Sequence, residues 1–324
     1  MEIIKRPRRN RFSPTRRALI KETKFSAGQL IAPLFIKAGV NQKEPLPSLP
    51  GVFAFTADAA LKECEELLKL GIGSVILFPI IDKGEKDHDG TKALSRSNHL
   101  AKAVQLIKKE CPEMVIMVDI ALDAYTSHGH DGLIDGSGYV LNDSTNDILA
   151  DMSVLYGELG VDYVAPSDMM DGRVGKIRKH LDEKKLCNVG ILAYTAKYSS
   201  AFYGPYRNTL DSAPTIGDKK GYQMDPCNVK EALLEASLDE EEGADMLLVK
   251  PALAYLDIIY RIQQTTSLPV GGFHVSGEFA MLKAAAEKGW LNYEKALHEC
   301  ITAIFRSGAN FCITYGSKDL APHL

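Results

Sequence analysis

Short runs of apolar and β-branched residues recur along the chain from Leu30 onward, and they constrain its fold more than any other feature. The eight runs are LIAPLFI, SVILFPI, VIMVDIAL, DYVAPS, VGILAYT, DMLLVK, LPVGGFHV and NFCITY. They do not alternate regularly with polar residues, a pattern that is typical of parallel strands buried on both faces. The sequence therefore predicts a parallel sheet that is covered by helices.

Segments with helical periodicity and charged faces lie between most of these runs. They include AALKECEELLKLG, LAKAVQLIKKEC, STNDILADMSVLYGELG, VKEALLEASLDEEEG and GEFAMLKAAAEKGW, and most of them end at glycine, a common helix stop. Eight strands with intervening helices predict a (β/α)8 TIM barrel over residues 30–324, since such barrels have about 250 residues. A doubly wound open sheet is the alternative that fits the same alternation.

Residues 1–29 do not fit the barrel pattern and predict an extended N-terminal arm. This segment is rich in arginine and is interrupted by Pro7 and Pro14. It could be a solvated tail or a strap that packs on a neighbouring subunit. We disfavour a nucleic-acid-binding arm because the segment is poor in aromatic residues that could stack on bases.

Composition narrows the function classes. The chain is 45% hydrophobic and 25% charged, which is ordinary for a globular protein, and its formal net charge of -4 favours neither nucleic acid nor a membrane surface as a partner. Its six cysteines are dispersed and predict reduced thiols. No apolar stretch reaches the ~18 residues of a membrane span. We expect a cytoplasmic protein, or a plastid protein if a transit peptide has been removed.

Polar residues follow directly after several of the predicted strands. Because the active site of a barrel enzyme lies at the C-terminal ends of its strands, these residues are candidates for the site. They are Asp119, Asp123, Ser167, Asp168, Asp171, Lys197, Lys250, His274, Ser276 and Tyr315.

Two of these candidates, Lys197 and Lys250, predict covalent chemistry on carbonyl substrates. Burial and a nearby second cation both disfavour an ammonium group, so they would lower a lysine pKa from ~10.4 towards neutrality. A neutral amine can attack a ketone and form a Schiff base. The alternative is that each lysine is only an ion-pair partner of a carboxylate at the barrel mouth.

The loop from Lys197 to Gln223 is long and rich in Gly, Pro, Tyr and cationic residues. Long structured loops over a barrel mouth usually act as lids or binding loops. Arg207 and Lys219 could bind a substrate carboxylate there, for which arginine has the better geometry. As solvated loop charges they would need no such role.

Another segment, from Asp119 to Asp131, is crowded with residue types that bind metals. Its His128-Gly129-His130 sequence invites comparison with zinc hydrolases. The other histidines of the chain show no matching spacing. A glycine in a tight turn between two histidines is the structural alternative.

Six motifs together resemble the porphobilinogen synthase family, also called the 5-aminolaevulinate dehydratases. They are YTSHGHDG, APSDMMDGRV, AKYSSAFYGPYR, GDKKGYQMDP, EGADMLLVKP and HVSGEFAM. The resemblance runs from about Leu30 to Tyr315. It implies a (β/α)8 barrel with an N-terminal arm, assembly as a homo-octamer, and condensation of two 5-aminolaevulinate molecules to porphobilinogen with loss of two waters, in tetrapyrrole biosynthesis.

The same resemblance implies roles for individual residues. Lys250 matches the lysine that forms a Schiff base with the substrate of the propionate side, and Lys197 matches the lysine that binds the second substrate. The positions that bind the first carboxylate are Ser276 and Tyr315, those that bind the second are Arg207, Lys219 and Gln223, and those that line the pocket are Asp119, Ser167 and Asp168.

Metal use is where the chain departs from the zinc-dependent members. Three cysteines of those members correspond here to Ala121, Asp123 and Asp131. Carboxylates suit magnesium or another hard cation, whereas thiolates select zinc. The chain thus resembles the aspartate-type, magnesium-responsive branch, in which Glu235 matches a residue associated with an allosteric Mg²⁺. We expect no zinc and no organic cofactor, and Asp123 and Asp131 are candidates for an active-site cation.

Two alternative functions remain open at this point. Another class I aldolase would need one Schiff-base lysine and usually an anion site for a phosphorylated substrate, but no phosphate-binding glycine loop is evident. A non-catalytic barrel scaffold would not need both lysines.

Overall fold

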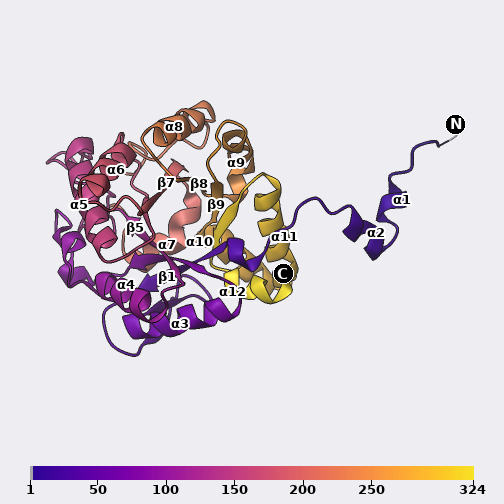
Figure 1. The fold of residues 1–324 in the computed structure, drawn as a ribbon, viewed down its shortest axis with the longest axis horizontal. Coiled ribbons are helices and arrows are strands. Elements are labelled where there is room, and N and C mark those ends of the chain that lie inside the picture. The colour runs from indigo at the N-terminus through magenta and orange to yellow at the C-terminus, as the bar shows by residue number, and fades with distance from the viewer. Residues whose placement is uncertain (1–2) are drawn as a thin grey trace.

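A closed barrel of parallel strands forms the centre of the molecule (Figure 1). The computed structural model describes residues 3–324. The barrel strands run in the order β1, β4, β5, β6, β7, β8, β9 and β10, and the pairing of β10 with β1 closes the barrel. Their bounds are β1 Leu30–Ile36, β4 Ser74–Pro79, β5 Val115–Ile120, β6 Tyr163–Pro166, β7 Gly190–Lys197, β8 Met246–Lys250, β9 Val270–His274 and β10 Phe311–Thr314. The predicted fold class is confirmed.

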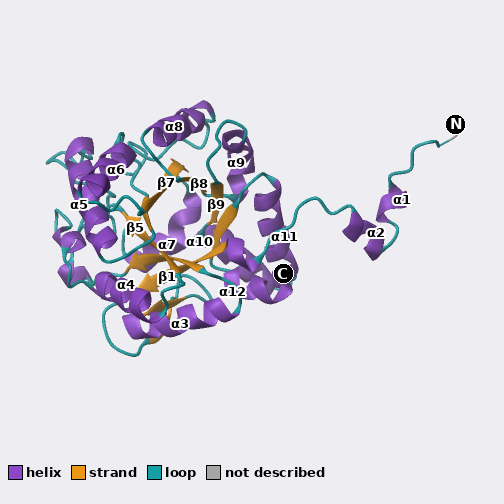
Figure 2. Cartoon of the chain, viewed as in Figure 1, coloured by secondary structure: helices purple, strands orange, loops and turns teal. Residues whose placement is uncertain are grey.

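Helices surround the barrel (Figure 2). Their bounds are α1 Arg8–Arg11, α2 Pro14–Leu19, α3 Ala57–Lys69, α4 His99–Glu110, α5 Asn142–Glu158, α6 Arg173–Glu183, α7 Gly204–Leu210, α8 Lys230–Glu241, α9 Leu256–Gln263, α10 Ser276–Glu287, α11 Tyr293–Arg306 and α12 Ser317–Leu320. The short 3-10 helices are η1 Ala27–Gln29, η2 Lys83–Glu85, η3 Thr91–Leu94, η4 Ala201–Tyr203, η5 Leu253–Tyr255 and η6 Ala321–His323. Among residues 3–324, no helix is long and apolar enough to cross a membrane.

Each of the eight apolar runs coincides with one barrel strand, as expected for strands that are buried on both faces. Inside the barrel, the aromatic side chains Phe35, Phe78, Tyr194 and Phe273 are fully or almost fully buried. They fill the space below the barrel mouth, where neighbouring ring centroids lie 5.8 to 6.5 Å apart. This aromatic layer is the floor of the site described below.

A short antiparallel ribbon extends the sheet beyond β1. Strand β3, Phe53–Phe55, pairs with the end of β1, and β2, Lys43–Pro45, pairs with β3. The sequence did not predict this ribbon, because three-residue strands are too short to show a periodic pattern.

Two segments depart from the regular barrel. The lid, residues 198–224, lies between β7 and α8 and contains η4 and α7. The N-terminal segment with α1 and α2 extends away from the barrel (Figure 1), and its Phe12 and Leu19 side chains are 82% and 85% exposed.

Candidate active site

The amine of Lys250 lies among aromatic rings at the end of β8. Its Nζ atom is 4.8 Å from the ring centroid of Phe273, 5.1 Å from those of Tyr194 and Tyr206, and 5.4 Å from that of Tyr203. Burial among these rings, reinforced by the positive charge of Lys197, lowers the pKa of Lys250 to about 7. A large share of this amine is therefore neutral near neutral pH.

Lys197 ends the neighbouring strand β7 and pairs in register with Lys250. Its Nζ donates to the Ser167 carbonyl and lies 3.6 Å from Asp131 Oδ1. Lys219 of the lid approaches the same carboxylate at 3.4 Å. Burial alone would raise the pKa of Asp131, but the two ammonium groups lower it below its ordinary value. Asp131 is therefore a shared counter-ion that joins a barrel lysine to a lid lysine.

Two further carboxylates behind the lysines differ in their partners. Burial raises the pKa of Asp119 to about 7, against the attraction of the Lys250 ammonium, and its Oδ1 has no hydrogen-bond partner among the described residues. Burial likewise raises the pKa of Asp168 to about 6. Asp168, however, accepts a 2.7 Å bond from the Met170 amide and faces Arg173 Nε at 3.9 Å. Asp168 is therefore held by its backbone bond and by Arg173, although its Oδ2, like Oδ1 of Asp119, has no hydrogen-bond partner among the described residues.

The lid brings Arg207, Lys219 and Gln223 to the same cavity as the two lysines. Arg207 stacks over the Tyr203 ring at 5.6 Å, and Gln223 Nε2 lies 3.4 Å from Asp131 Oδ2. The cavity they line has a volume of only about 20 Å³, roughly the room for one water molecule. The cavity therefore has no room for a substrate while the lid is in this position.

Ser276 and Tyr315 do not line this cavity. The Ser276 hydroxyl joins the barrel to the lid, since it accepts a 3.1 Å bond from the Tyr206 amide and donates a 3.3 Å bond to the Phe202 carbonyl. Tyr315 stacks on Phe35 with ring centroids 6.1 Å apart. Both residues nevertheless lie close to the four rings around Lys250, here called the Lys250 cage. Ser276 contacts Tyr206 of this cage, and Tyr315 packs on Phe35 of the aromatic floor.

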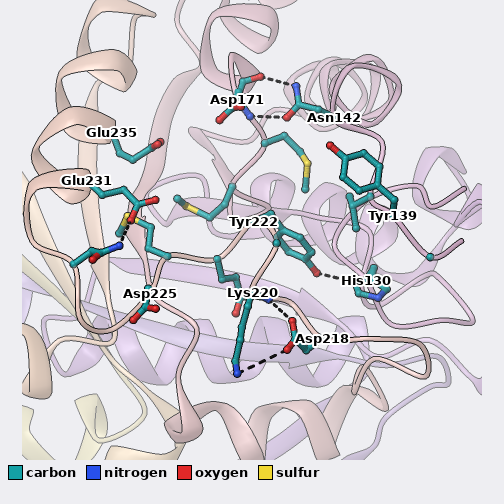
Figure 3. A pocket seen from close by; sticks show the side chains of 18 residues that line it. His130, Tyr139, Asn142, Asp171, Asp218, Lys220, Tyr222, Asp225, Glu231 and Glu235 are labelled. Atoms are coloured by element: carbon teal, nitrogen blue, oxygen red, sulfur yellow. Dashed lines mark hydrogen bonds and ion pairs between the residues drawn. The ribbon is translucent and has the colours of Figure 1, made fainter.

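Glu235 lies outside this cavity, in a second pocket of about 400 Å³. Figure 3 shows Glu235 and Glu231 reaching into the pocket from α8, opposite Asp171 and Asn142. Burial raises the pKa of Glu235 to about 7. Among the described residues, no three His, Cys, Asp or Glu side chains are arranged to hold one metal ion. The oxygen donors suit an ion such as Mg²⁺ that keeps most of its water ligands.

The residues around Asp123 and Asp131 do not fit a divalent cation. Lys219 Nζ lies 3.5 Å from Asp123 Oδ2 and 3.4 Å from Asp131 Oδ1, so an ammonium group already occupies the position between the two carboxylates. A divalent ion there would face the charges of both Lys219 and Lys197.

Two cations next to the site, the half-buried Lys86 and the buried Arg173, were not predicted from the sequence. Lys86 Nζ donates to the carbonyls of Leu210 and Asp211 at 2.7 and 2.9 Å, and thereby binds the C-terminal end of α7. Arg173 forms a two-point ion pair with Asp239 at 3.2 Å behind Asp168. Arg173 belongs to the APSDMMDGRV motif, which could have identified it, whereas nothing in the sequence around Lys86 distinguishes it from a solvated lysine.

Fold and site together define a class: (β/α)8 barrels with two buried lysine amines at the ends of neighbouring strands, beneath a long loop. A family model described as delta-aminolevulinic acid dehydratase matches residues 4–323. The chain belongs to this family, and the porphobilinogen synthase function predicted from the sequence is confirmed.

Relatives in other organisms agree with this assignment. The chain is 50% identical over 317 residues to the delta-aminolevulinic acid dehydratase of Chlamydia pneumoniae, covering 98% of this chain and 95% of the relative. It is 44% identical over 319 residues to that of Bacillus subtilis, covering 98% of each. A crystal structure of the Toxoplasma gondii enzyme in complex with the reaction product porphobilinogen matches with a TM-score of 0.97 and 42% identity, covering 99% of this chain and 92% of that one.

Proposed function

We propose that Lys250 and Lys197 each bind one 5-aminolaevulinate molecule as a Schiff base, and that the enzyme then joins the two molecules to form porphobilinogen. The observation that carries this proposal is the aromatic cage of Lys250, which lowers the pKa of a lysine to about 7 at the end of a barrel strand. A lysine kept only for structure would gain nothing from losing its charge.

In the proposed chemistry, a neutral lysine amine attacks the ketone carbon of a substrate, and the resulting carbinolamine loses water to give an imine. The imine makes the neighbouring carbon more acidic. Asp119 can carry protons near neutral pH because its pKa is raised and its Oδ1 is unpartnered among the described residues. A carbon–carbon bond then forms at one imine carbon and a carbon–nitrogen bond, from the amino group of a substrate, at the other. Each lysine amine leaves from the carbon that it had attacked, and loss of a proton gives the aromatic pyrrole.

The carboxylates of the two substrates need cationic or hydroxyl partners. Arg207, Lys219 and Gln223 of the lid line the cavity that the two lysines share. We assign them to the second substrate, because Lys219 and Gln223 also contact Asp131, the counter-ion of Lys197. Ser276 and Tyr315 are assigned to the first substrate, because they lie beside the rings that enclose Lys250. Lys219 would exchange part of its pairing with Asp131 for the substrate carboxylate.

Trapping with borohydride tests the two lysines. Incubation with 5-aminolaevulinate and borohydride should add to Lys250, and separately to Lys197, the mass of one substrate less one oxygen atom, as a reduced imine requires. In Lys250→Met, the adduct at position 250 should be lost, and porphobilinogen formation should be lost with it.

Lys179→Met is the matched control, since the Lys179 side chain is 72% exposed on α6, and it should behave as the unsubstituted chain. Porphobilinogen formation without an adduct on either lysine would contradict the mechanism. An adduct on Lys250 alone would leave Lys197 as a binding residue without covalent chemistry.

We propose further that the enzyme belongs to the aspartate-type, magnesium-responsive branch. Two observations support this: Lys219 occupies the position between Asp123 and Asp131, and the pocket at Glu235 offers oxygen donors. Glu235 would hold Mg²⁺ there, and Glu231 and Asp171 of the same pocket would bind its water ligands. The ion would supply positive charge beside α8. Asp123 and Asp131 then serve as counter-ions of the lysines.

Assembly and location are proposals of the same kind. The exposed apolar residues of the N-terminal arm support contacts between subunits, and a homo-octamer is the state that we propose. Cytoplasm is the proposed location for the enzyme. The plastid is the alternative, since relatives in Physcomitrium patens and Chlamydomonas reinhardtii, 45% and 42% identical, are named chloroplastic.

A further inference from the structure

The turn formed by His128, Gly129 and His130, here called the latch turn, packs against the lid. The Thr215 amide donates a 3.0 Å bond to the His128 carbonyl. At Gly129, where φ is +76°, a Cβ atom would lie only 2.6 Å from the carbonyl oxygen of Ala213. Only glycine lets the two backbones approach this closely while keeping the positive φ.

His130 connects two points of the lid. Its Nε2 lies 2.8 Å from the Ile216 carbonyl, and its Nδ1 lies 3.1 Å from the Tyr222 hydroxyl (Figure 3). A carbonyl can only accept, so Nε2 carries the proton, and in the neutral ring Nδ1 accepts from Tyr222. One buried imidazole thus ties both sides of the loop that carries Lys219 to the barrel.

The ring nitrogens of the two histidines are all engaged, which argues against a metal role. His128 Nε2 lies 3.0 Å from the His88 carbonyl, and His128 Nδ1 accepts a 3.1 Å bond from the His130 amide. Both nitrogens of His130 bond to the lid. No lone pair is left for zinc, and of the two histidines that suggested a metal site, His130 instead bonds to the lid.

The latch turn also reaches the reactive lysine. The Tyr222 hydroxyl accepts a 3.3 Å bond from the Asp131 amide. The Asp131 carboxylate lies 3.6 Å from Lys197 Nζ and 3.4 Å from Lys219 Nζ. The same tyrosine that bonds to His130 therefore also holds the backbone of the shared counter-ion.

We infer that His130 is a positioning residue that holds the 212–222 part of the lid closed, and so places Lys219 and Asp131 for binding at Lys197. This inference rests on the proposed role of Lys197. The cavity of about 20 Å³ requires the lid to open for each substrate pair, so the bonds of His130 must break and re-form during turnover. The cage of Lys250 has Tyr194 and Phe273 from the barrel and lies outside this part of the lid.

Two substitutions of His130 distinguish its hydrogen bonds to the lid from a role in packing alone. His130→Leu removes both bonds to the lid. His130→Gln keeps a donor and an acceptor and should restore much of the function. His180→Leu is the matched control, since the His180 ring bonds to the Lys176 carbonyl within its own helix, α6.

In His130→Leu, the amides of residues 212–224 should exchange with deuterium about tenfold faster, the effect expected when a bond of ordinary strength is lost. The KM for 5-aminolaevulinate should rise about tenfold. The borohydride adduct on Lys197 should fall, while the adduct on Lys250 stays near the unsubstituted yield. The amides of β4 and β5 should exchange as before, which checks the fold.

Unchanged lid exchange together with an unchanged KM would overturn the inference, as would an equal loss of both adducts, which would mean general damage to the barrel. If His130→Leu does not fold, Tyr222→Phe removes one of the two bonds, that of His130 Nδ1, from the lid side, and the same measurements should show a smaller change in the same direction. Absence of adducts in the unsubstituted chain would refute the proposed lysine chemistry, while lid exchange would still test the latch.

Discussion

Lys250 and Lys197 end neighbouring strands in register, yet their surroundings give them different properties. Lys250 has aromatic rings around its amine, whereas Lys197 faces the Asp131 carboxylate and the Ser167 carbonyl. Rings cannot neutralise an ammonium group as a carboxylate does, so the burial penalty acts more fully on Lys250. We therefore expect Lys250 to form its imine first.

The reaction of Lys250 should depend on pH with a defined sign. Below a pH of about 7 its amine becomes protonated and cannot attack, so adduct formation should slow as the pH falls. Lys197→Met removes a cation that lowers the pKa of Lys250, and the acid limb should then move to higher pH. The rate of adduct formation on Lys250, followed by mass spectrometry across a pH series, measures this.

Lys179→Met provides the comparison for this experiment and should leave the acid limb where it is. A limb that moves to lower pH in Lys197→Met would show that the interaction between the two lysines has been assigned the wrong sign.

Substitution of Glu235 should change only the response of the enzyme to Mg²⁺. Glu235→Gln removes the carboxylate that we assign to Mg²⁺ in the second pocket, so stimulation by Mg²⁺ after chelation should be lost, while borohydride still labels Lys250. Glu241→Gln, at the end of the same helix, should retain the response to Mg²⁺. Recovery of the Glu235→Gln enzyme by Mg²⁺ to the unsubstituted level would exclude this residue as the binding group.

The position of polar residues after apolar runs made Asp119, Ser167, Lys197 and Lys250 predictable from the sequence, because strand ends meet at the barrel mouth. The partners of these residues were not predictable. Asp131 joins Lys197 to Lys219 because the loop after β5 packs against the lid after β7. A local sequence pattern cannot predict such a contact between distant segments.

Among the elements, strand β9 shows how glycine shapes the barrel wall. A Cβ atom at Gly271 would lie 2.1 Å from the ring of Phe311 in the neighbouring strand β10. Gly271→Ala should therefore lower the free energy of unfolding by about 1–3 kcal/mol, the usual cost of overpacking a core. The midpoint of denaturant unfolding measures the change.

Gly73→Ala is the control for this substitution, since a Cβ atom there meets no atom within 4 Å. It should be neutral or slightly stabilising because it restricts the unfolded chain. Equal midpoints for the two variants would mean that the Phe311 ring moves aside at little cost.

The barrel strands and five of the helices could be predicted from their sequence patterns, whereas several short elements could not. The barrel strands and five long helical segments have patterns that span several residues, whereas β2, β3 and α7 are too short for a pattern to develop. Helix α7 lies inside what the sequence presents as an irregular loop. It ends at Leu210 and is followed by the C-cap Asp211, whose φ of 48° is uncommon for residues other than glycine.

At the scale of the whole molecule, the N-terminal arm should drive assembly. Phe12 and Leu19 expose most of their apolar surface on the subunit, and burying it against a neighbour would be favourable. The double substitution Phe12→Ser and Leu19→Ser should shift the protein to smaller oligomers in sedimentation velocity. Thr15→Ser, in the same helix as Leu19, should assemble as the unsubstituted chain, and an unaltered distribution for the double variant would rule out these contacts.

The small volume under the lid has a consequence for inhibitor design. A search that fits compounds into about 20 Å³ would reject even the enzyme's own substrates. Effective compounds should instead be chosen to fit the open form, or to carry a carbonyl group that Lys250 can capture before the lid closes. For such compounds, the observed binding rate should stop rising with compound concentration when the compound is in excess. The rate should then equal the opening rate of the lid.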